Sequence, residues 1–122
     1  MKVLIVDDET DVRRVARLCL SRVGRMDVFD AATGTEAVGL AFLERPDAIL
    51  LDVMMPEMDG PSTLAALRAN PVTAAIPVIF LTAKSLASEI ERLRSLGVAG
   101  VLAKPFDPMT FAGQVRALVQ GC

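Results

Sequence analysis

The sequence contains no histidine, no tryptophan and no tyrosine, and its only aromatic residues are five phenylalanines. Without histidine the chain has no imidazole general base, no Ser-His-Asp triad and no histidine ligand for zinc. Its two cysteines, Cys19 and Cys122, are far apart, and two isolated cysteines form neither a disulfide framework nor a metal-binding motif. These absences exclude the commonest hydrolytic and zinc-dependent chemistries.

An excess of basic charge is also missing, because 13 lysines and arginines stand against 15 aspartates and glutamates, for a net charge of −2. Nucleic-acid binding depends on such an excess, so we expect no nucleic-acid partner. The purely apolar runs, such as residues 3–6 and 48–51, are far too short to cross a bilayer, and no basic-then-apolar leader precedes them. We therefore expect a soluble cytoplasmic protein that does not bind a membrane.

Hydrophobic residues are plentiful, at 52% of 122 residues, while charged residues make up 23%. A chain of this length and composition is long enough to bury its own core and is typical of one folded domain. No linker, repeat or low-complexity tract divides it. We expect one domain over residues 1–122, without an attached output domain.

Short apolar runs alternate with segments of helical periodicity along the chain. The runs are continuous and rich in β-branched residues, which is typical of strands covered on both faces in a parallel sheet. They are residues 3–6, 28–31, 48–51, 78–81 and 100–103. Three helices are predicted from apolar stripes and two more from the segments 35–44 and 61–70; the stripes are Val12, Val15, Ala16 and Cys19, then Leu86, Ile90 and Leu93, then Ala112, Val115, Leu118 and Val119.

Five such strand–helix units predict a three-layer, doubly wound α/β fold, because crossovers between parallel strands are right-handed. The common order for a five-stranded parallel sheet of this kind is 2-1-3-4-5. Its topological switch point lies between the first and third strands, and ligands bind there, outside the carboxyl ends. We therefore expect functional residues directly after Val6 and directly after Leu51.

Acidic residues occupy both of these places. Asp7, Asp8 and Glu9 follow the first strand, and Asp52 follows the third. Carboxylates ~4 Å apart repel by about 4 kcal/mol at an effective dielectric constant near 20, and a bound cation removes this cost. Because every side-chain ligand on offer is an oxygen, we expect a hard ion, and Mg²⁺ suits two or three carboxylates completed by water.

The ends of the fourth and fifth strands add a hydroxyl and an ammonium group. Thr82 and Lys104 follow the runs 78–81 and 100–103, so both face the same edge as the acids. Taken singly, the aspartate pair or Thr82 could cap a helix, Asp52 could lie in a turn and Lys104 could be solvated. Together with a divalent metal they describe a site for a phosphoryl group, with Asp52 as the candidate nucleophile.

Four segments in order closely resemble the receiver domain of two-component response regulators, and the resemblance spans about residues 2–119. They are LIVDDE at 4–9, LDVMMPEMDG at 51–60, LTAK at 81–84 and KPF at 104–106. The resemblance implies that Asp52 accepts a phosphoryl group from a phosphohistidine on a sensor histidine kinase or a histidine phosphotransfer protein. Since this chain has no histidine, a partner must carry that residue.

The resemblance also implies roles for the other site residues. The Mg²⁺ ligands would be Asp7, Asp8, Asp52 and the backbone carbonyl of Met54, with Asp7 acting mostly through water. Lys104 would pair with the phosphoryl oxygens, Thr82 would hydrogen-bond one of them, and the Lys104–Pro105 peptide bond would be cis. Such a protein catalyses only its own phosphorylation and dephosphorylation, so it is not an enzyme in the usual sense.

The expected output is a downstream protein that binds the face formed by the fourth helix, fifth strand and fifth helix. Receivers commonly carry an aromatic residue or histidine three positions before the lysine, and here the residue is Val101. A short β-branched side chain has little room to change rotamer, so we expect Val101 simply to fill the core. Five arginines crowd the first helix and its exit, and we expect them to form a solvated face: Arg13, Arg14, Arg17, Arg22 and Arg25. The resemblance adds that kinases and phosphotransfer domains often dock beside this helix in the family.

Other interpretations remain open. Val101 is also compatible with a receiver-like interaction module that works without phosphorylation. An aspartyl-phosphate hydrolase of the haloacid dehalogenase type would need an acid/base aspartate where this chain has Met54. A flavodoxin-type electron carrier would need a stacking tryptophan or tyrosine and a hydroxyl-rich phosphate loop after the first strand, and the sequence offers neither.

Overall fold

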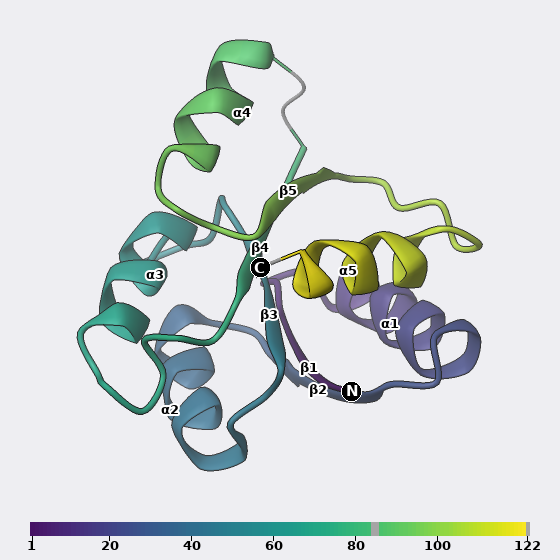
Figure 1. The fold of residues 1–122 in the computed structure, drawn as a ribbon, viewed down its shortest axis with the longest axis horizontal. Coiled ribbons are helices and arrows are strands. Elements are labelled where there is room, and N and C mark those ends of the chain that lie inside the picture. The colour runs from purple at the N-terminus through teal and green to yellow at the C-terminus, as the bar shows by residue number, and fades with distance from the viewer. Residues whose placement is uncertain (84–85, 122) are drawn as a thin grey trace.

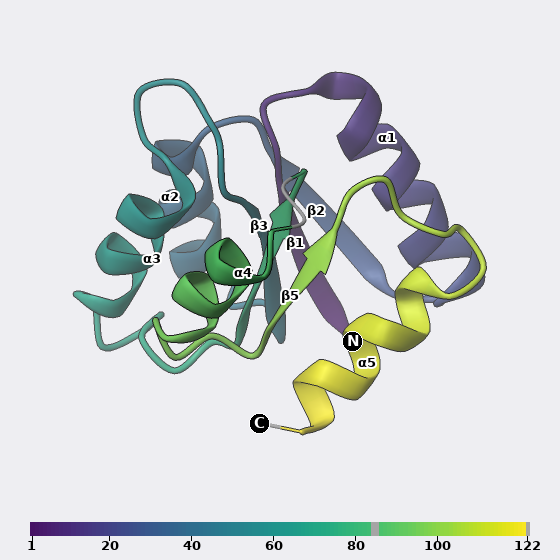
Figure 2. The same ribbon diagram turned by 90° about the horizontal axis from the view of Figure 1, so that it is seen from above.

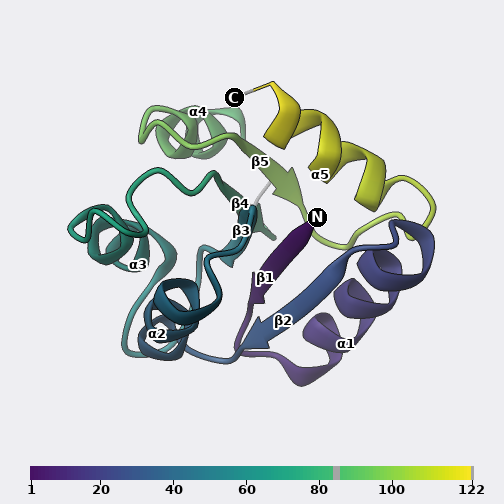
Figure 3. The same cartoon turned by 60° about the horizontal axis from the view of Figure 1, so that its bottom comes forward.

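A computed structural model describes residues 1–83 and 86–121; Lys84 of the LTAK segment and Cys122 lie outside the described residues. Five parallel strands form one sheet in the order β2-β1-β3-β4-β5 (Figures 1 and 3). The strands are β1 (Lys2–Val6), β2 (Asp27–Ala31), β3 (Ala48–Asp52), β4 (Val78–Thr82) and β5 (Gly100–Ala103). The predicted fold class and strand order are confirmed.

Helices cover both faces of the sheet, as Figure 2 shows: α1 and α5 lie on one side, and α2, α3 and α4 on the other. They are α1 (Thr10–Leu18), which continues into a π-helical turn η1 (Cys19–Val23), α2 (Gly34–Glu44), α3 (Gly60–Arg68), α4 (Ala87–Arg94) and α5 (Phe111–Gln120). Within residues 1–83 and 86–121, no helix has the length and apolar character needed to span a bilayer.

The core consists of two apolar clusters, one on each face of the sheet. Successive side chains of a strand point to opposite faces. Val3 and Ile5 of β1 therefore join the cluster beneath α1 and α5, while Leu4 and Val6 join the cluster beneath α2 and α3. This double coverage explains why the strands read as continuous apolar runs.

Local signals fix where two of the helices begin. The hydroxyl of Thr33 accepts a hydrogen bond from the Glu36 N–H at 3.1 Å before α2. The Asp59 carboxylate accepts one from the Ser62 N–H at 2.8 Å before α3, which also has Pro61 in its first turn. The same N–H keeps the pKa of Asp59 below its ordinary value. Each of these caps therefore fixes the residue at which its helix begins.

Two of the predicted apolar stripes differ from the structure. Val15 is 46% exposed and Leu86 is 67% exposed. The buried residues of the first helix and its π-helical turn are Ala16, Cys19 and Leu20, whereas Val15 lines an open cavity together with Pro105 and Phe106. Leu86 is exposed because it is the N-cap residue that precedes α4.

Candidate functional site

The site lies at the carboxyl ends of β1 and β3, which are neighbours in the sheet. Val6 of β1 pairs with Leu51 of β3, so Asp7 and Asp52, the next residues along each strand, lie side by side. Carboxylate oxygens of Asp7, Asp8 and Asp52 all lie within 4.8 Å of one another. Asp7 and Asp52 are buried, whereas Asp8 is exposed. The acidic cluster expected at the switch point is therefore present.

Lys104 enters this cluster from the end of β5. Its Nζ lies 3.1 Å from Asp7 Oδ2 and 3.1 Å from Asp52 Oδ1. The Lys104 side chain is only 14% exposed, so the solvated-loop interpretation is wrong. Within the part of the chain that the structure describes, this ammonium group thus contacts two of the three carboxylates, so the three acids carry more negative charge than it offsets.

The capping interpretations are also wrong. The N-cap residue of α1 is Glu9, for which no side-chain capping hydrogen bond is found among the described residues. The Asp7 carboxylate instead accepts a hydrogen bond from the backbone N–H of Glu9, two residues further along the chain, at 2.9 Å. Thr82 does not cap α4, because the N-cap residue there is Leu86.

Thr82 and Met54 flank Asp52 from two sides. Thr82 is buried and is the last residue of β4, whose Leu81 pairs with Asp52. The Met54 N–H donates to Asp52 Oδ1 at 3.4 Å, so Asp52 also makes the turn contact considered from the sequence. The Lys104–Pro105 peptide bond is cis, as the resemblance implied. The structure therefore places all of the predicted side chains at one edge of the sheet.

Burial and charge perturb the two groups at the centre. Burial, together with the neighbouring charge of Asp7, raises the pKa of Asp52 to about 6, although Lys104 and the Met54 N–H oppose the change. Burial acts to lower the pKa of Lys104, but its contacts with Asp7 and Asp52 outweigh this and raise that pKa above its ordinary value. Lys104 therefore stays protonated. A further cation bound beside Asp52 would stabilise its charged carboxylate and lower its pKa.

Sequence reasoning placed Arg13 on a solvated face, and the structure corrects this. The Arg13 side chain is only 16% exposed. Its Nη1 donates to the backbone carbonyl of Asp7 at 2.7 Å, and its Nε lies 3.8 Å from Asp30 of β2, which also contacts Arg17. Arg13 therefore supports the loop that carries the acids. The i, i+4 spacing of Arg13 and Arg17 was visible in the sequence, but their shared partner on β2 was not.

Gly60 fixes the distance between α3 and the end of β3. A Cβ atom at this position would lie 2.7 Å from the carbonyl oxygen of Asp52 and 2.9 Å from Cα of Val53. Both contacts are with backbone, which cannot move aside easily. The glycine after Asp59 is therefore required for the close approach that holds Asp52 in place.

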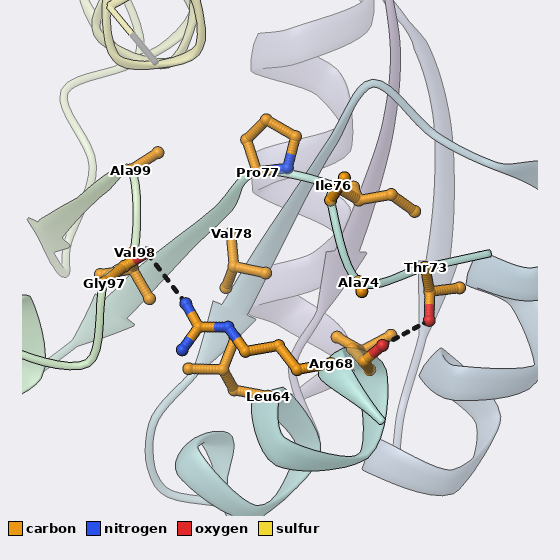
Figure 4. A pocket seen from close by; sticks show the side chains of 12 residues that line it. Leu64, Arg68, Thr73, Ala74, Ile76, Pro77, Val78, Gly97, Val98 and Ala99 are labelled. Carbon is orange, nitrogen blue, oxygen red and sulfur yellow. Dashed lines mark hydrogen bonds between the residues drawn. The ribbon is translucent and has the colours of Figure 1, made fainter. Parts of the chain in front are cut away.

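A separate cavity of about 230 Å³ lies at the opposite, amino-terminal edge of the sheet (Figure 4). Arg68 of α3 crosses it and donates to the carbonyls of Leu96 and Gly97, which precede β5. Thr73 donates to the Leu67 carbonyl at its other side. The arginine joins α3 to the segment after α4, and the cavity has no part in the acidic site.

Comparison with known proteins places these observations in a family. Residues 3–116 match the family model described as "Response regulator receiver domain". The solved structure of the chemotaxis protein CheY4 of Vibrio cholerae superimposes with a TM-score of 0.87 at 32% identity, covering 96% of this chain and 97% of that one.

Two curated relatives differ in how much of their length is matched. The protein PilG of Pseudomonas aeruginosa is 34% identical over 119 residues, covering 98% of this chain and 87% of PilG. A protein named "Probable transcriptional regulator ycf27" from Cyanophora paradoxa is 39% identical over 120 residues, which is 48% of its length. The chain thus spans about half of ycf27 but most of PilG.

Proposed function

Because the chain belongs to the response regulator receiver family, we propose that it is a signalling phosphoacceptor in which Asp52 takes a phosphoryl group from a phosphohistidine on a partner protein. The partner would be a sensor histidine kinase or a histidine phosphotransfer protein. The observation that supports this most directly is the cluster of Asp7, Asp8 and Asp52, in which the Lys104 ammonium lies 3.1 Å from both Asp7 and Asp52. Carboxylates, a fixed cation and a strand-end hydroxyl are what phosphoryl transfer requires.

The donor set fits Mg²⁺. All of the candidate ligands are oxygens, three carboxylates converge within 4.8 Å, and Asp8 is open to solvent. Such a site suits a small hard ion that keeps some of its water. Asp7, Asp8, Asp52 and the Met54 carbonyl would hold the ion, which when bound supplies positive charge for the phosphoryl oxygens.

Asp52, Lys104 and Thr82 would each have a separate role in the phosphoryl transfer. Asp52 Oδ1 is engaged by Lys104 and by the Met54 N–H, so Oδ2 is the oxygen that would attack phosphorus. The new O–P bond forms as the P–N bond to the partner's imidazole breaks, and the imidazole leaves with that electron pair. Lys104 would then pair with a phosphoryl oxygen and the Thr82 hydroxyl would donate to another. Water later attacks the same phosphorus and restores the carboxylate.

The proposal is tested by incubating the protein with Mg²⁺ and a small acyl phosphate and measuring its mass. We expect a gain of about 80 Da, the mass of one phosphoryl group, which is absent in Asp52→Ala and retained in the exposed control Asp11→Ala. No gain in the wild-type protein would contradict the proposal and favour an interaction module that works without phosphorylation. Steady turnover of added phosphate esters would instead favour a hydrolase.

We place the phosphodonor's docking surface beside α1. An open cavity of about 420 Å³, lined by Val12, Val15, Pro105 and Phe106 among others, adjoins Lys104 there. Arg14 and Arg22 on the same helical segment are exposed. The double change Arg14→Glu and Arg22→Glu should slow transfer from the partner protein at least tenfold, about 1.4 kcal/mol, yet spare labelling by a small acyl phosphate. Equal losses with both donors, measured by initial rates, would count against docking here.

The downstream protein would bind the face formed by α4, β5 and α5. A groove of about 560 Å³ runs between these elements and is lined in part by Val98, Val101 and Leu118. Val101 packs against the core but is only half-buried, so it also contributes to this surface and does not simply fill the core. Phosphorylation should shift the amide resonances of Thr82, Val101 and Leu118. Changes confined to the acidic residues would contradict this route.

We also propose that the chain acts as a single-domain regulator in the cytoplasm. The high coverage of PilG and of CheY4 supports this, although ycf27 carries a further segment of similar length. Immunodetection in the source cells tests both points. A species near 13.0 kDa in the cytoplasmic fraction is expected, and a product of about twice that mass would contradict it.

A further inference from the structure

The outer face of α2 is apolar although nothing in the described fold covers it. Leu43 is 73% exposed and Phe42 is 44% exposed. Gly39, one turn before them, is exposed as well. Figures 1 and 2 show α2 at the outside of its layer, with α3 beside it. Positions 39, 42 and 43 are separated by three and four residues and so share one side of the helix.

Gly39 has no role in the packing of the chain itself. A Cβ atom there would have nothing within 4 Å. By contrast, a Cβ at Gly34 of the same helix would collide with Thr63 and Met58 of the neighbouring segment, so the packing of α2 against α3 explains that glycine. Glycine in a helix interior is unfavourable relative to alanine. Gly39 therefore leaves a hollow on the surface, directly beside two exposed hydrophobic side chains.

The charges at the two ends of this face indicate what fills the hollow. Glu36 lies in the first turn of α2 and Arg45 caps its carboxyl end, and both are exposed. If two copies of α2 pack antiparallel about a two-fold axis, Leu43 of each copy meets Gly39 of the other. The same arrangement sets each Glu36 near the Arg45 of the other copy. A parallel arrangement would instead place like charges together.

We propose that the chain self-associates through this face, with the α2 helices of two copies packed antiparallel and each Leu43 seated over the opposite Gly39. The contact is isologous and closes with two copies. A helix of 11 residues is about 16 Å long and offers a face on the order of a few hundred Å². Stable dimers bury about 800 Å² on each partner. The association is therefore weak and concentration-dependent, and it does not involve the acidic site.

Sedimentation of the intact chain between about 10 µM and about 1 mM tests the proposal. We expect the average mass to rise toward that of two copies at the upper end. Leu43→Glu should weaken association by about tenfold or more, while Leu86→Glu, at the similarly exposed N-cap leucine before α4, should leave it unchanged. A constant monomer mass, or a dimer broken by Leu86→Glu alone, would overturn the proposal.

Two further sets of variants separate association from folding. Glu36→Arg and Arg45→Glu should each weaken the dimer, and the double variant should restore it; failure of the restoration would overturn the antiparallel pairing. Gly39→Gln should raise the midpoint of thermal unfolding of the monomer but weaken association. The matched control is Gly113→Gln on α5, where a Cβ also meets nothing within 4 Å. It should raise the midpoint without changing association, and equal effects of both glutamines on the dimer would contradict the assignment.

Discussion

Asp52→Asn should make the metal-free protein more stable at pH 7, by up to about 3 kcal/mol, while abolishing phosphoryl acceptance. The pKa of Asp52 is raised in the folded state from 3.8 to about 6. Because the folded protein holds this proton more tightly than the unfolded chain does, the contribution of Asp52 to wild-type stability is most favourable below the unfolded pKa. It falls as the pH rises through the folded pKa, and asparagine removes this loss because it carries no charge.

Urea denaturation in a chelator between about pH 4 and pH 7 measures the effect. The difference in the free energy of unfolding between Asp52→Asn and wild type should be small at the acidic end and should grow toward neutrality. The exposed Asp11→Asn provides the control and should follow the wild-type curve. Saturating Mg²⁺ should stabilise the wild-type protein more than Asp52→Asn, since the ion binds the charged carboxylate. A pH-independent difference would contradict the assigned cause.

Lys104→Met is expected to lower both the rate of phosphoryl acceptance and the stability of the protein. Labelling by a small acyl phosphate should slow by on the order of 10²- to 10³-fold, because the fixed ammonium no longer offsets charge on the transferred group. Stability at neutral pH should fall by about 3 kcal/mol, because two buried carboxylates lose the cation that contacts both at 3.1 Å. The stability loss should fade at low pH, where Asp52 is protonated.

The matched control for Lys104→Met is Lys2→Met. Lys2 contacts Glu44 at 3.6 Å, but both side chains are more than one-third exposed, and exposed ion pairs contribute little to stability. Initial rates of mass gain and urea denaturation should therefore be close to wild type for this control. A Lys104→Met protein that is labelled at the wild-type rate would show that the ammonium does not assist the transfer.

The sequence was most informative where the signal is local. Continuous apolar runs predicted all five strands to within a residue at each end, and the rule that ligands bind at the carboxyl ends of strands correctly predicted Asp7, Asp8 and Asp52 as one cluster. The errors came from interactions between distant segments. Val15 was assigned to the core, but it lines an open cavity with Pro105 and Phe106, which follow a strand at the other end of the chain. Arg13 was assigned to solvent because its partner Asp30 belongs to another strand.

The ion pair between Lys104 and Asp7 joins residues 97 positions apart in the chain. Closing so long a loop costs conformational entropy, and domains rich in such contacts fold more slowly than domains held by local contacts. A chain that has folded only its first three strands, and so lacks β4 and β5, would bring Asp7 and Asp52 together without the ammonium that compensates them. During synthesis the acids therefore exist before the cation does. The complete set of acids and ammonium therefore exists only in a chain whose first and last strands have joined one sheet.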